Sequence, residues 1–487
     1  MSRPSLQTPQ TRVFFSSSYL EVLLNLPAIR IIAMKVTTPE ISWHNKEAIQ
    51  SVDIQKKVVK SNGTETVYRI ATAGNDCHVV IWHATVGDDF KIEYASDLNR
   101  HQKTVNVVRF SPSGDYLASG DDDGSVIIWK QKAANEEQAN LFDEGSEESI
   151  EHWTALKVLR GHLEDVYDVS WSPDSKNLMS GSVDNSVILW NVEAGRKVAV
   201  LKDHKGLVQG VSWCPSDKFI ASLCTDRICR IYSPKTHRVI NRIHQSPLNS
   251  SLTNEDGTLQ QFKLFHDDTL ATFHRRLTFS PDGELLVVPA GILCPREQRK
   301  KRHMPNATYV FSTKNLKHPV MYLPTGERFT VAVSFCPIFF ELLPGCDPVV
   351  PLPYRLIWAV ATQNSVLLYD SQHQTPLALI SHIHYARLSD LNWSPDGRLL
   401  IVSSSDGYCS CITLADGELG TPVTDQQKFM PKLVEEKKKG KAKKASSGSE
   451  PKEQPKVEQV EIKDVEPEDE IKLVLEDTVD VVMGAEV

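Results

Sequence analysis

Short apolar runs separated by turn-forming residues extend along most of this 487-residue chain. Segments such as "VYDVSW" (166–171), "NLMSGS" (177–182) and "SVILW" (186–190) are rich in aliphatic and aromatic residues, and Gly, Pro, Asp or Asn lies between such runs. Runs of this kind are typical of strands joined by tight turns. The pattern therefore predicts an all-β protein built from antiparallel strands.

The runs belong to a longer repeat, seen most clearly in residues 101–129, 162–190 and 204–232. Each stretch begins with a histidine, has an aromatic residue nine positions later, and ends with an aspartate followed by an aromatic residue six positions on. Weaker copies begin at His44 and His384, and two more lie between residues 275 and 370. Seven such copies resemble a WD-repeat protein and predict a seven-bladed β-propeller.

The repeat divides the chain into three predicted parts. Residues 34–415 are predicted to form the propeller, and residues 1–33 a dispensable N-terminal extension without ordered structure. From 416 to 487 the composition changes to Lys, Glu, Ser and Pro, which is typical of a disordered charged tail. We expect "TPEISW" (38–43) to pair with the last blade and close the ring, because closure removes exposed sheet edges.

Each strong copy contains histidine, serine and aspartate, the residue types of a nucleophilic triad. A catalytic set is needed once, whereas this set recurs in successive copies and none has the Gly-x-Ser-x-Gly setting that exposes a serine. In WD-repeat propellers, such a set is a buried relay: the aspartate accepts from the histidine, and the serine contacts the histidine and accepts from an indole N–H. We therefore predict no catalytic residue. The predicted relay residues are His101, Ser119, Asp123, Trp129, His162, Ser180, Asp184, Trp190, His204, Ser222 and Asp226.

Composition narrows the function classes further. The net charge is −8, and no run of about eighteen apolar residues could span a bilayer. The nine cysteines include no Cys-x-x-Cys pair, so we predict no metal site and expect reduced, mostly buried thiols. A glycine-rich phosphate loop is also absent from the sequence, and we predict neither a cofactor nor enzymatic activity.

Several stretches that the blade plan does not require resemble one family. They include "EISWHNKEAIQSVDI", "FHDDTLATFHRRLTFSPDG" and "SDLNWSPDGRLLIVSSSDGYCS". They are similar to the B-subunit family of chromatin assembly factor 1, the medium WD-repeat subunits of that histone chaperone. The resemblance implies a nuclear scaffold that joins a large and a small subunit and helps deposit newly made core histones on replicated or repaired DNA. DNA contact would be indirect or weak, and the anti-silencing histone chaperone is a further partner that the resemblance suggests.

A second hypothesis is a substrate receptor of a cullin ubiquitin ligase, another common role of WD-repeat propellers. Such receptors usually carry Trp-Asp-x-Arg at the end of a blade. Here Tyr369 and Asp370 are followed by "SQHQ", so the sequence lacks this signature.

Three residue sets are candidate interaction sites, each with a simpler alternative. A blade-five set combines aromatics and arginines, which are enriched at interface hot spots, although packing within the blade would also explain it. An acidic set is predicted to face histones, the alternative being a solvated loop, and a lysine set is predicted to be a nuclear signal, the alternative being solubilising charge. The blade-five set is His266, Asp267, Asp268, Phe273, Arg275 and Arg276; the acidic set is Glu136, Glu137, Asp143, Glu144, Glu147, Glu148 and Glu151; the lysine set is Lys437, Lys438, Lys439, Lys441, Lys443 and Lys444.

Overall fold

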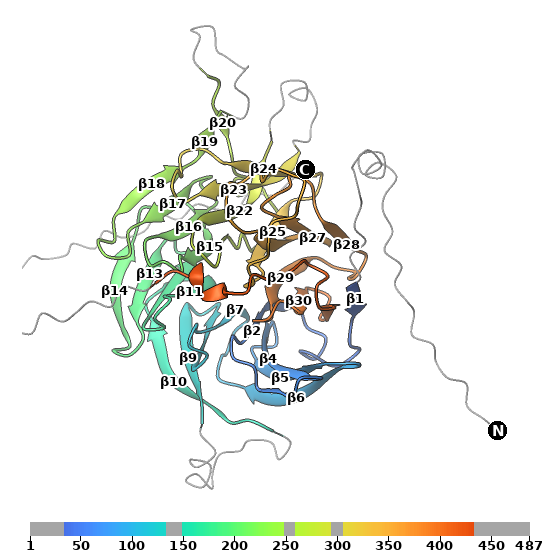
Figure 1. Cartoon of the computed structure of the whole chain (residues 1–487). Helices are drawn as coiled ribbons and strands as arrows, with labels where there is room; N and C mark the ends of the chain where they lie inside the picture. The colour runs from blue at the N-terminus through green and yellow to red at the C-terminus, as the bar shows by residue number, and fades with distance from the viewer. Residues whose placement is uncertain (1–33, 133–148, 248–258, 294–304, 433–487) are drawn as a thin grey trace, which may run out of the picture. The chain divides into compact units, whose positions relative to one another are not determined.

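Seven blade sheets, six of four strands and one of five, surround a central channel in the computed structural model, which describes residues 34–132, 149–247, 259–293 and 305–432 (Figure 1). Each sheet is antiparallel, and its first strand is the innermost. Successive inner strands contact one another around the channel, and the ring closes where the inner strands of blades seven and one meet. The predicted all-β, seven-bladed propeller is confirmed.

Blades one to four follow one another along the chain. Blade one contains β2 (Ile49–Ile54), β4 (Thr66–Gly74), β5 (Val79–Val86) and β6 (Phe90–Leu98), with the short β3 (Lys60–Ser61) beside β4. Blade two contains β7 (Val105–Phe110), β8 (Tyr116–Asp121), β9 (Ser125–Gln131) and β10 (Trp153–Arg160). Blade three contains β11 (Val166–Trp171), β12 (Asn177–Ser182), β13 (Val187–Asn191) and β14 (Arg196–Leu201). Blade four contains β15 (Val208–Trp213), β16 (Ile220–Cys224), β17 (Cys229–Tyr232) and β18 (Val239–Ile243).

The last three blades carry longer connections. Blade five contains β21 (Thr278–Phe279), β22 (Leu285–Ile292), β23 (Asn306–Ser312) and β24 (Met321–Gly326), and a separate two-stranded ribbon of β19 (Gln245–Ser246) and β20 (Phe262–Lys263) precedes it. Blade six contains β25 (Thr330–Phe335), β26 (Ile357–Thr362), β27 (Ser365–Asp370) and β28 (Ala378–Ser381). Blade seven contains β29 (Leu388–Trp393), β30 (Leu399–Ser404), β31 (Cys409–Leu414) and β1 (Met34–Thr37).

The hydrophobic core lies between neighbouring blades. Val107 and Ile128 of blade two pack in one cluster with Val169, Leu178 and Ile188 of blade three, and all five are almost fully buried. The inner and middle strands are covered on both faces, so buried residues follow one another along them instead of alternating with exposed ones. Packing between neighbouring blades thus joins the repeated units into one ring.

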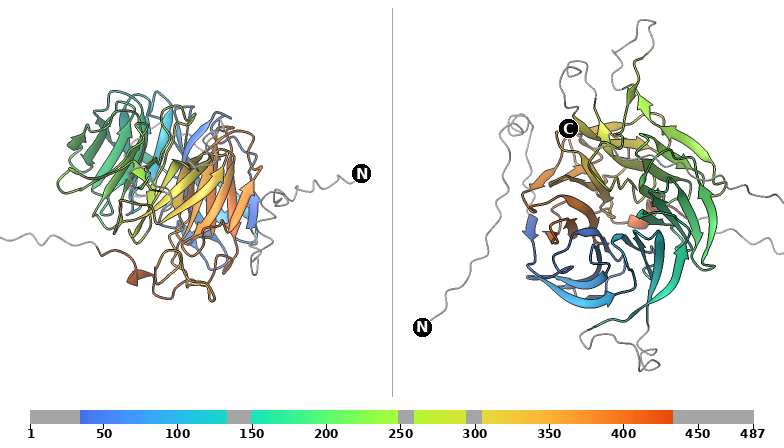
Figure 2. Two further views of the ribbon diagram at one scale, coloured as in Figure 1. Left: turned by 90° about the horizontal axis from the view of Figure 1, so that it is seen from above. Right: turned by 180° about the vertical axis from the view of Figure 1, so that it is seen from behind.

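The first strand of the ring closes the last blade, but not with the residues we predicted. β1 pairs antiparallel with β31, with Met34 opposite Leu414 and Thr37 opposite Cys411 (Figure 2). The predicted segment 38–43 is instead irregular with bends, and Trp43 enters the core of blade one. Closure by the N-terminal end of the propeller is therefore correct, whereas the assigned segment is a few residues too late.

The chain beyond blade seven remains packed against the propeller as far as residue 432. Residues 416–432 cross to blade six, where the ring of Phe429 lies 4.4 Å from Tyr354 and 5.8 Å from Phe339. The short 3₁₀ helix η3 (Gln426–Lys428) lies over the centre of the ring in Figure 1. The prediction of a disordered tail from residue 416 is therefore wrong for this segment, because its apolar residues Val423, Phe429 and Met430 pack against the hydrophobic cluster of blades five and six.

Candidate functional site

The relay of blade three contains the predicted contacts. His162 Nδ1 lies 3.0 Å from the Asp184 carboxylate, and His162 Nε2 lies 2.7 Å from Ser180 Oγ. Since an ionised carboxylate can only accept, Nδ1 donates to Asp184. The indole N–H of Trp190 donates to the same Ser180 oxygen at 2.8 Å. The Ser180 hydroxyl is fully buried and already bonded, which is the opposite of an exposed nucleophile.

Blade two builds its relay with a different aspartate from the one predicted. His101 contacts Ser119 at 2.6 Å, but its Nδ1 contacts Asp121 at 2.7 Å, and Asp123 is exposed. The other Asp121 oxygen accepts the backbone N–H groups of Asp123 and Ser125. Asp121 ends β8 and is buried, whereas Asp123 lies at the tip of the turn. The assignment of Asp123 is therefore wrong.

Blade four breaks the relay between its histidine and its aspartate. His204 Nε2 contacts Ser222 at 2.8 Å, as predicted, but Asp226 forms an ion pair with Arg230 at 2.6 Å. His204 Nδ1 is left without a hydrogen bond. Burial, together with the charge of Arg230, lowers the pKa of His204 to about 4. A buried arginine in β17 has thus taken the carboxylate that the histidine would need.

Relays also occur in two of the weaker copies. In blade one His44 contacts Asp76 at 2.7 Å and Thr72 at 2.8 Å, and Trp82 donates to the same threonine. In blade seven His384 contacts Asp406 at 3.1 Å, but Val402 stands where the other blades have the hydroxyl residue and Ile412 stands where an indole would donate, so the relay stops at the histidine. These networks attach loops to strands within their own blades, which is a structural task.

The blade-five set does not form the exposed surface that we predicted. Arg275 and Arg276 are 0% and 3% exposed. The Arg275 guanidinium donates to the backbone carbonyls of His266 and Asp267 in its own loop. A Cβ placed on Gly210 of β15 would lie only 2.0 Å from the Arg275 carbonyl oxygen, so this loop packs directly against blade four. Arg275 therefore points inward, where it satisfies the buried carbonyls of its own loop.

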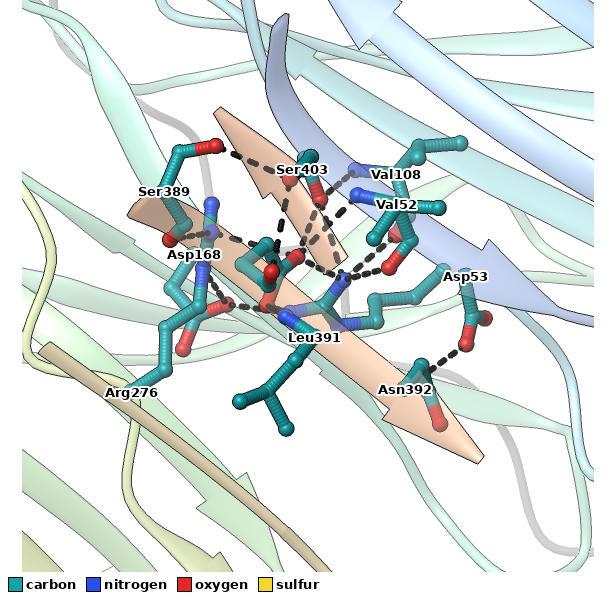
Figure 3. Close-up of polar contacts among 12 residues, drawn as sticks. Val52, Asp53, Val108, Asp168, Arg276, Ser389, Leu391, Asn392 and Ser403 are labelled. Carbon is teal, nitrogen blue, oxygen red and sulfur yellow. Dashed lines mark hydrogen bonds and ion pairs between the residues drawn. The ribbon is translucent and has the colours of Figure 1, made fainter. Parts of the chain in front are cut away.

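Arg276 enters the central channel, where Figure 3 shows its side chain beside Asp168 and Ser389. Its guanidinium donates to the carbonyls of Gln50 in blade one at 3.0 Å, Asn106 in blade two at 2.7 Å and Ser389 in blade seven at 3.0 Å. It also lies 3.1 Å from the Asp390 carboxylate. One side chain from blade five therefore cross-links the inner strands of the ring.

The channel contains a charge network that sequence reasoning missed. Arg109 lies 2.7 Å from Asp390, which also accepts from Ser51 Oγ at 2.8 Å. Burial opposes ionisation of Asp390, but Arg109 and Arg276 outweigh it and hold the pKa at about 2. Asp168 accepts from Val211 N at 2.9 Å and lies 3.7 Å from Arg276. The available signal was a charged residue in the middle of an otherwise apolar inner strand, as in "VYDVSW" and "VNVVRF".

A cavity of about 690 Å³ lies beside this network, at the ends of the inner strands where the first turn of each blade begins. Among its charged lining groups, Asp53, Asp168 and Asp390 face Lys56, Arg109 and Arg276, so positive and negative charges balance. Burial raises the pKa of Asp53 to about 6 although Arg109 favours its charged form. Prolines that follow the inner strands form its rim together with the C-terminal segment. These lining residues are Pro112, Pro173, Pro215, Pro281, Pro337, Pro395, Gln426, Gln427, Met430 and Pro431.

The exposed part of the blade-five set is smaller than predicted. Phe273 is 65% exposed, with its ring 6.1 Å from Tyr167 of blade three, and Asp268 is exposed. His266 contacts Asn306 of blade five at 2.7 Å and Asp267 lies 3.4 Å from Arg227 of blade four, so both are partly covered. Phe273 and Asp268 are the members that remain accessible to a partner.

Comparison with known proteins places this geometry in a family. A family model described as the CAF1B/HIR1 beta-propeller domain matches residues 34–419. The chain belongs to the CAF1B/HIR1 β-propeller family. The B subunit of chromatin assembly factor 1 from Mus musculus is 43% identical over 407 residues, covering 81% of this chain and 69% of the relative. The corresponding B subunit from Saccharomyces cerevisiae is 32% identical, covering 78% and 86%, and Protein HIR1 of Kluyveromyces lactis is 27% identical, covering 74% and 41%.

One predicted member of the acidic set has a structural role in this CAF1B/HIR1 propeller. Glu151 is 6% exposed and accepts from Arg69 Nε at 2.8 and 3.0 Å, while His83 Nε2 lies 2.7 Å from it. Burial alone would raise its pKa, but these hydrogen bonds outweigh burial and hold the pKa at about 2. Assigning Glu151 to a histone-facing loop is therefore wrong, because its charged carboxylate is buried and already paired with Arg69 and His83.

The remaining charged candidates lie outside the described residues. They are Glu136, Glu137, Asp143, Glu144, Glu147 and Glu148 of the acidic set, and Lys437, Lys438, Lys439, Lys441, Lys443 and Lys444 of the lysine set. Within the described ranges, no cluster of His, Cys, Asp and Glu could hold a metal ion, and no helix is long and apolar enough to cross a membrane. The eight cysteines in these ranges are free thiols, six of them buried.

Proposed function

We propose that this chain is a non-catalytic WD-repeat scaffold subunit of a nuclear histone chaperone that deposits newly made core histones on replicated or repaired DNA. The observation that carries the proposal is the 43% identity with the B subunit of chromatin assembly factor 1 across 81% of the chain. The relays support it, because the residues that resemble a catalytic triad are engaged in attaching loops to strands within a blade. Its partners would be the large and small subunits of that factor, core histones and the anti-silencing histone chaperone.

The large subunit would dock around Phe273. This ring projects from a loop in which the Arg275 guanidinium holds the backbone carbonyls of His266 and Asp267, so the exposed aromatic is presented on a rigid base. Rigid, exposed aromatics are typical anchors of protein interfaces. The neighbouring Asp268 adds an exposed charge that would favour a basic segment of the partner.

Co-expression with the large and small subunits and core histones tests the assignment. We expect the wild-type chain to co-purify with both subunits, and Phe273→Asp to lose the large subunit while keeping its thermal unfolding temperature. Ile240→Asp is the matched control, because Ile240 is 53% exposed on an outer strand of blade four, and it should retain the large subunit. Retention in the Phe273 variant would refute the docking face alone. Absence of chaperone subunits and histones from the wild-type purification would refute the function.

The acidic set without Glu151 is proposed to attract histones by charge, and the lysine set to direct nuclear import. Diffuse electrostatic attraction weakens with salt. Neutralising Glu136, Glu137, Asp143, Glu144, Glu147 and Glu148 should therefore lower histone affinity of the assembled complex modestly at low ionic strength, with little effect at high salt. Unchanged affinity at low salt would mean that these acids have no part in histone handling.

The cullin-receptor hypothesis gains no support from the described residues. Asp370, which follows the last aromatic of blade six, is fully buried and lies 3.2 Å from Arg355. It stabilises the blade and is not available as an external docking residue.

A further inference from the structure

Blade six brings together a cysteine, a histidine and an aspartate that lie apart in the sequence. Cys346 is exposed in the connection between β25 and β26, and His373 follows β27. Cys346 Sγ lies 3.6 Å from His373 Nε2, and His373 Nδ1 lies 3.0 Å from both oxygens of Asp370. Thiol, imidazole and carboxylate thus lie in the order found where a base, oriented by a carboxylate, activates a thiol.

The Asp370 carboxylate determines which imidazole nitrogen faces the sulfur. Asp370 is fully buried and accepts the backbone N–H groups of Gln372 and His373 at 3.1 and 2.8 Å. Because it can only accept from the ring, His373 Nδ1 carries the proton and Nε2 presents its lone pair to Cys346. The Gln372 amide donates to Cys346 Sγ at 3.4 Å, which favours negative charge on the sulfur. The Leu343 carbonyl is a longer alternative acceptor for the thiol, at 3.9 Å.

The two loops are fixed relative to each other by further contacts. Leu343 N donates to Gln372 Oε1 at 2.8 Å, and Val350 N donates to the Ser371 carbonyl at 3.1 Å. Asp370 is also anchored by Arg355 through an ion pair of 3.2 Å. These contacts therefore fix the distance between the Cys346 sulfur and the His373 imidazole.

We propose that Cys346 is a thiol modification site, activated by His373 and positioned through Asp370, that forms mixed disulfides with low-molecular-mass disulfides. His373 Nε2 takes the thiol proton as Cys346 sulfur attacks one sulfur of the disulfide. The new S–S bond forms as the old one breaks, and the second sulfur leaves as a thiolate that is then protonated. Cys346 is oxidised and one equivalent of small thiol is released.

The pH dependence follows from the state of His373. The hydrogen bond with Asp370 raises the pKa of His373 above its usual 6.5, while burial and Arg355 oppose that shift. Asp370, Arg355 and Cys346 are the titratable groups that face the ring. Only neutral His373 can accept the proton, so reactivity is lost as pH falls through its pKa. Above that pKa, Cys346 reacts where an ordinary thiol with a pKa near 8.5 is still largely protonated.

Oxidised glutathione is the probe, with each cysteine of the folded full-length chain followed by peptide mass spectrometry from pH 5.5 to 9. Cys77 is the internal control: it is partly exposed, its thiol lies 3.7 Å from the Asn75 carbonyl, and burial raises its pKa. At pH 7.5 Cys346 should react at least about tenfold faster than Cys77, in line with general-base assistance.

The variant His373→Gln removes the base but leaves Asp370 paired with Arg355. We expect it to slow Cys346 about tenfold, to move its pH profile to that of an ordinary thiol, and to leave Cys77 unchanged. Buried Cys214 and Cys409 report on folding, because they react only if the blades open. If Cys346 in the wild-type chain reacts no faster than Cys77 and its profile inflects near pH 8.5, the proposal is wrong, whatever the variant does. An unchanged Cys346 rate in a folded His373→Gln chain would overturn it equally.

Discussion

Asp121 and Asp123 lie two residues apart in one turn of blade two, yet only the Asp121 carboxylate is buried and bonded to His101. Asp121→Ala should leave His101 Nδ1 and two backbone N–H groups without an acceptor and lower the free energy of unfolding by about 1–3 kcal/mol. Asp123→Ala is the matched control and should stay within about 0.5 kcal/mol of wild type, since its side chain is exposed. Urea unfolding of both variants measures this, and equal effects would contradict the assignment.

The low pKa of Glu151 predicts that the free energy of unfolding decreases as the pH falls. Its pKa is about 2 in the folded chain and near 4.5 when unfolded, so the unfolded state binds the proton more tightly. The stabilisation from the charged form is present above pH 4.5 and is lost as pH falls toward 2. Between pH 6 and pH 3 the wild-type chain should therefore lose more stability than Glu151→Gln, which has no titrating carboxylate there. Parallel pH profiles for the two chains would rule out this contribution.

Single residues also explain where sequence reasoning succeeded and failed. The histidine–serine contacts in blades two, three and four were predictable because their spacing recurs. The aspartate partner was not, since blade two has three consecutive aspartates, of which only the fold selects Asp121 for His101, and Arg230 in blade four competes for Asp226. Recurrence identifies a position, whereas local competition between polar groups decides which atoms pair.

At the scale of elements, the short strand β1 should contribute strongly to the stability of the ring. Four residues pair with β31 and cover an edge that would otherwise be open. Deleting residues 1–37 should lower the thermal unfolding temperature and promote aggregation, whereas deleting residues 1–33 should change neither, because it leaves β1 intact. Thermal unfolding and light scattering measure both, and equal tolerance of the two deletions would contradict closure by β1.

Strands could be predicted from the sequence where the same pattern of apolar residues recurs in successive blades. The strands of blades two, three and four follow directly from such recurring runs. The closing strand was misplaced because "MKVT" and "TPEISW" are both short and partly apolar, and only pairing with residues 411–414 distinguishes them. The packed segment 416–432 was missed because Phe429 finds its partners, Phe339 and Tyr354, about eighty residues earlier in the chain.

At the scale of the whole molecule, the ring is held by contacts between blades as well as within them. Arg276 of blade five bonds to blades one, two and seven, and its pairing with Asp390 joins residues more than a hundred positions apart. No sequence pattern specifies such pairs, because each depends on the closed ring bringing inner strands together. The same charge network explains how a channel lined by carboxylates and guanidinium groups remains stable.

Arg276→Met therefore tests whether the channel network stabilises the entire ring. The substitution keeps much of the apolar side-chain volume but leaves the buried Asp168 and Asp390 short of a positive charge and three carbonyls short of a donor. Breaking a buried ion pair from one side costs about 3–5 kcal/mol, so the urea midpoint should fall well below that of wild type. Arg387→Met is the control, because Arg387 is exposed and donates to the Ala271 carbonyl at 2.7 Å; it should cost less than about 1 kcal/mol. Similar small losses in both variants would mean that the blades are held by apolar packing alone, and that the charges in the channel are tolerated without contributing to stability.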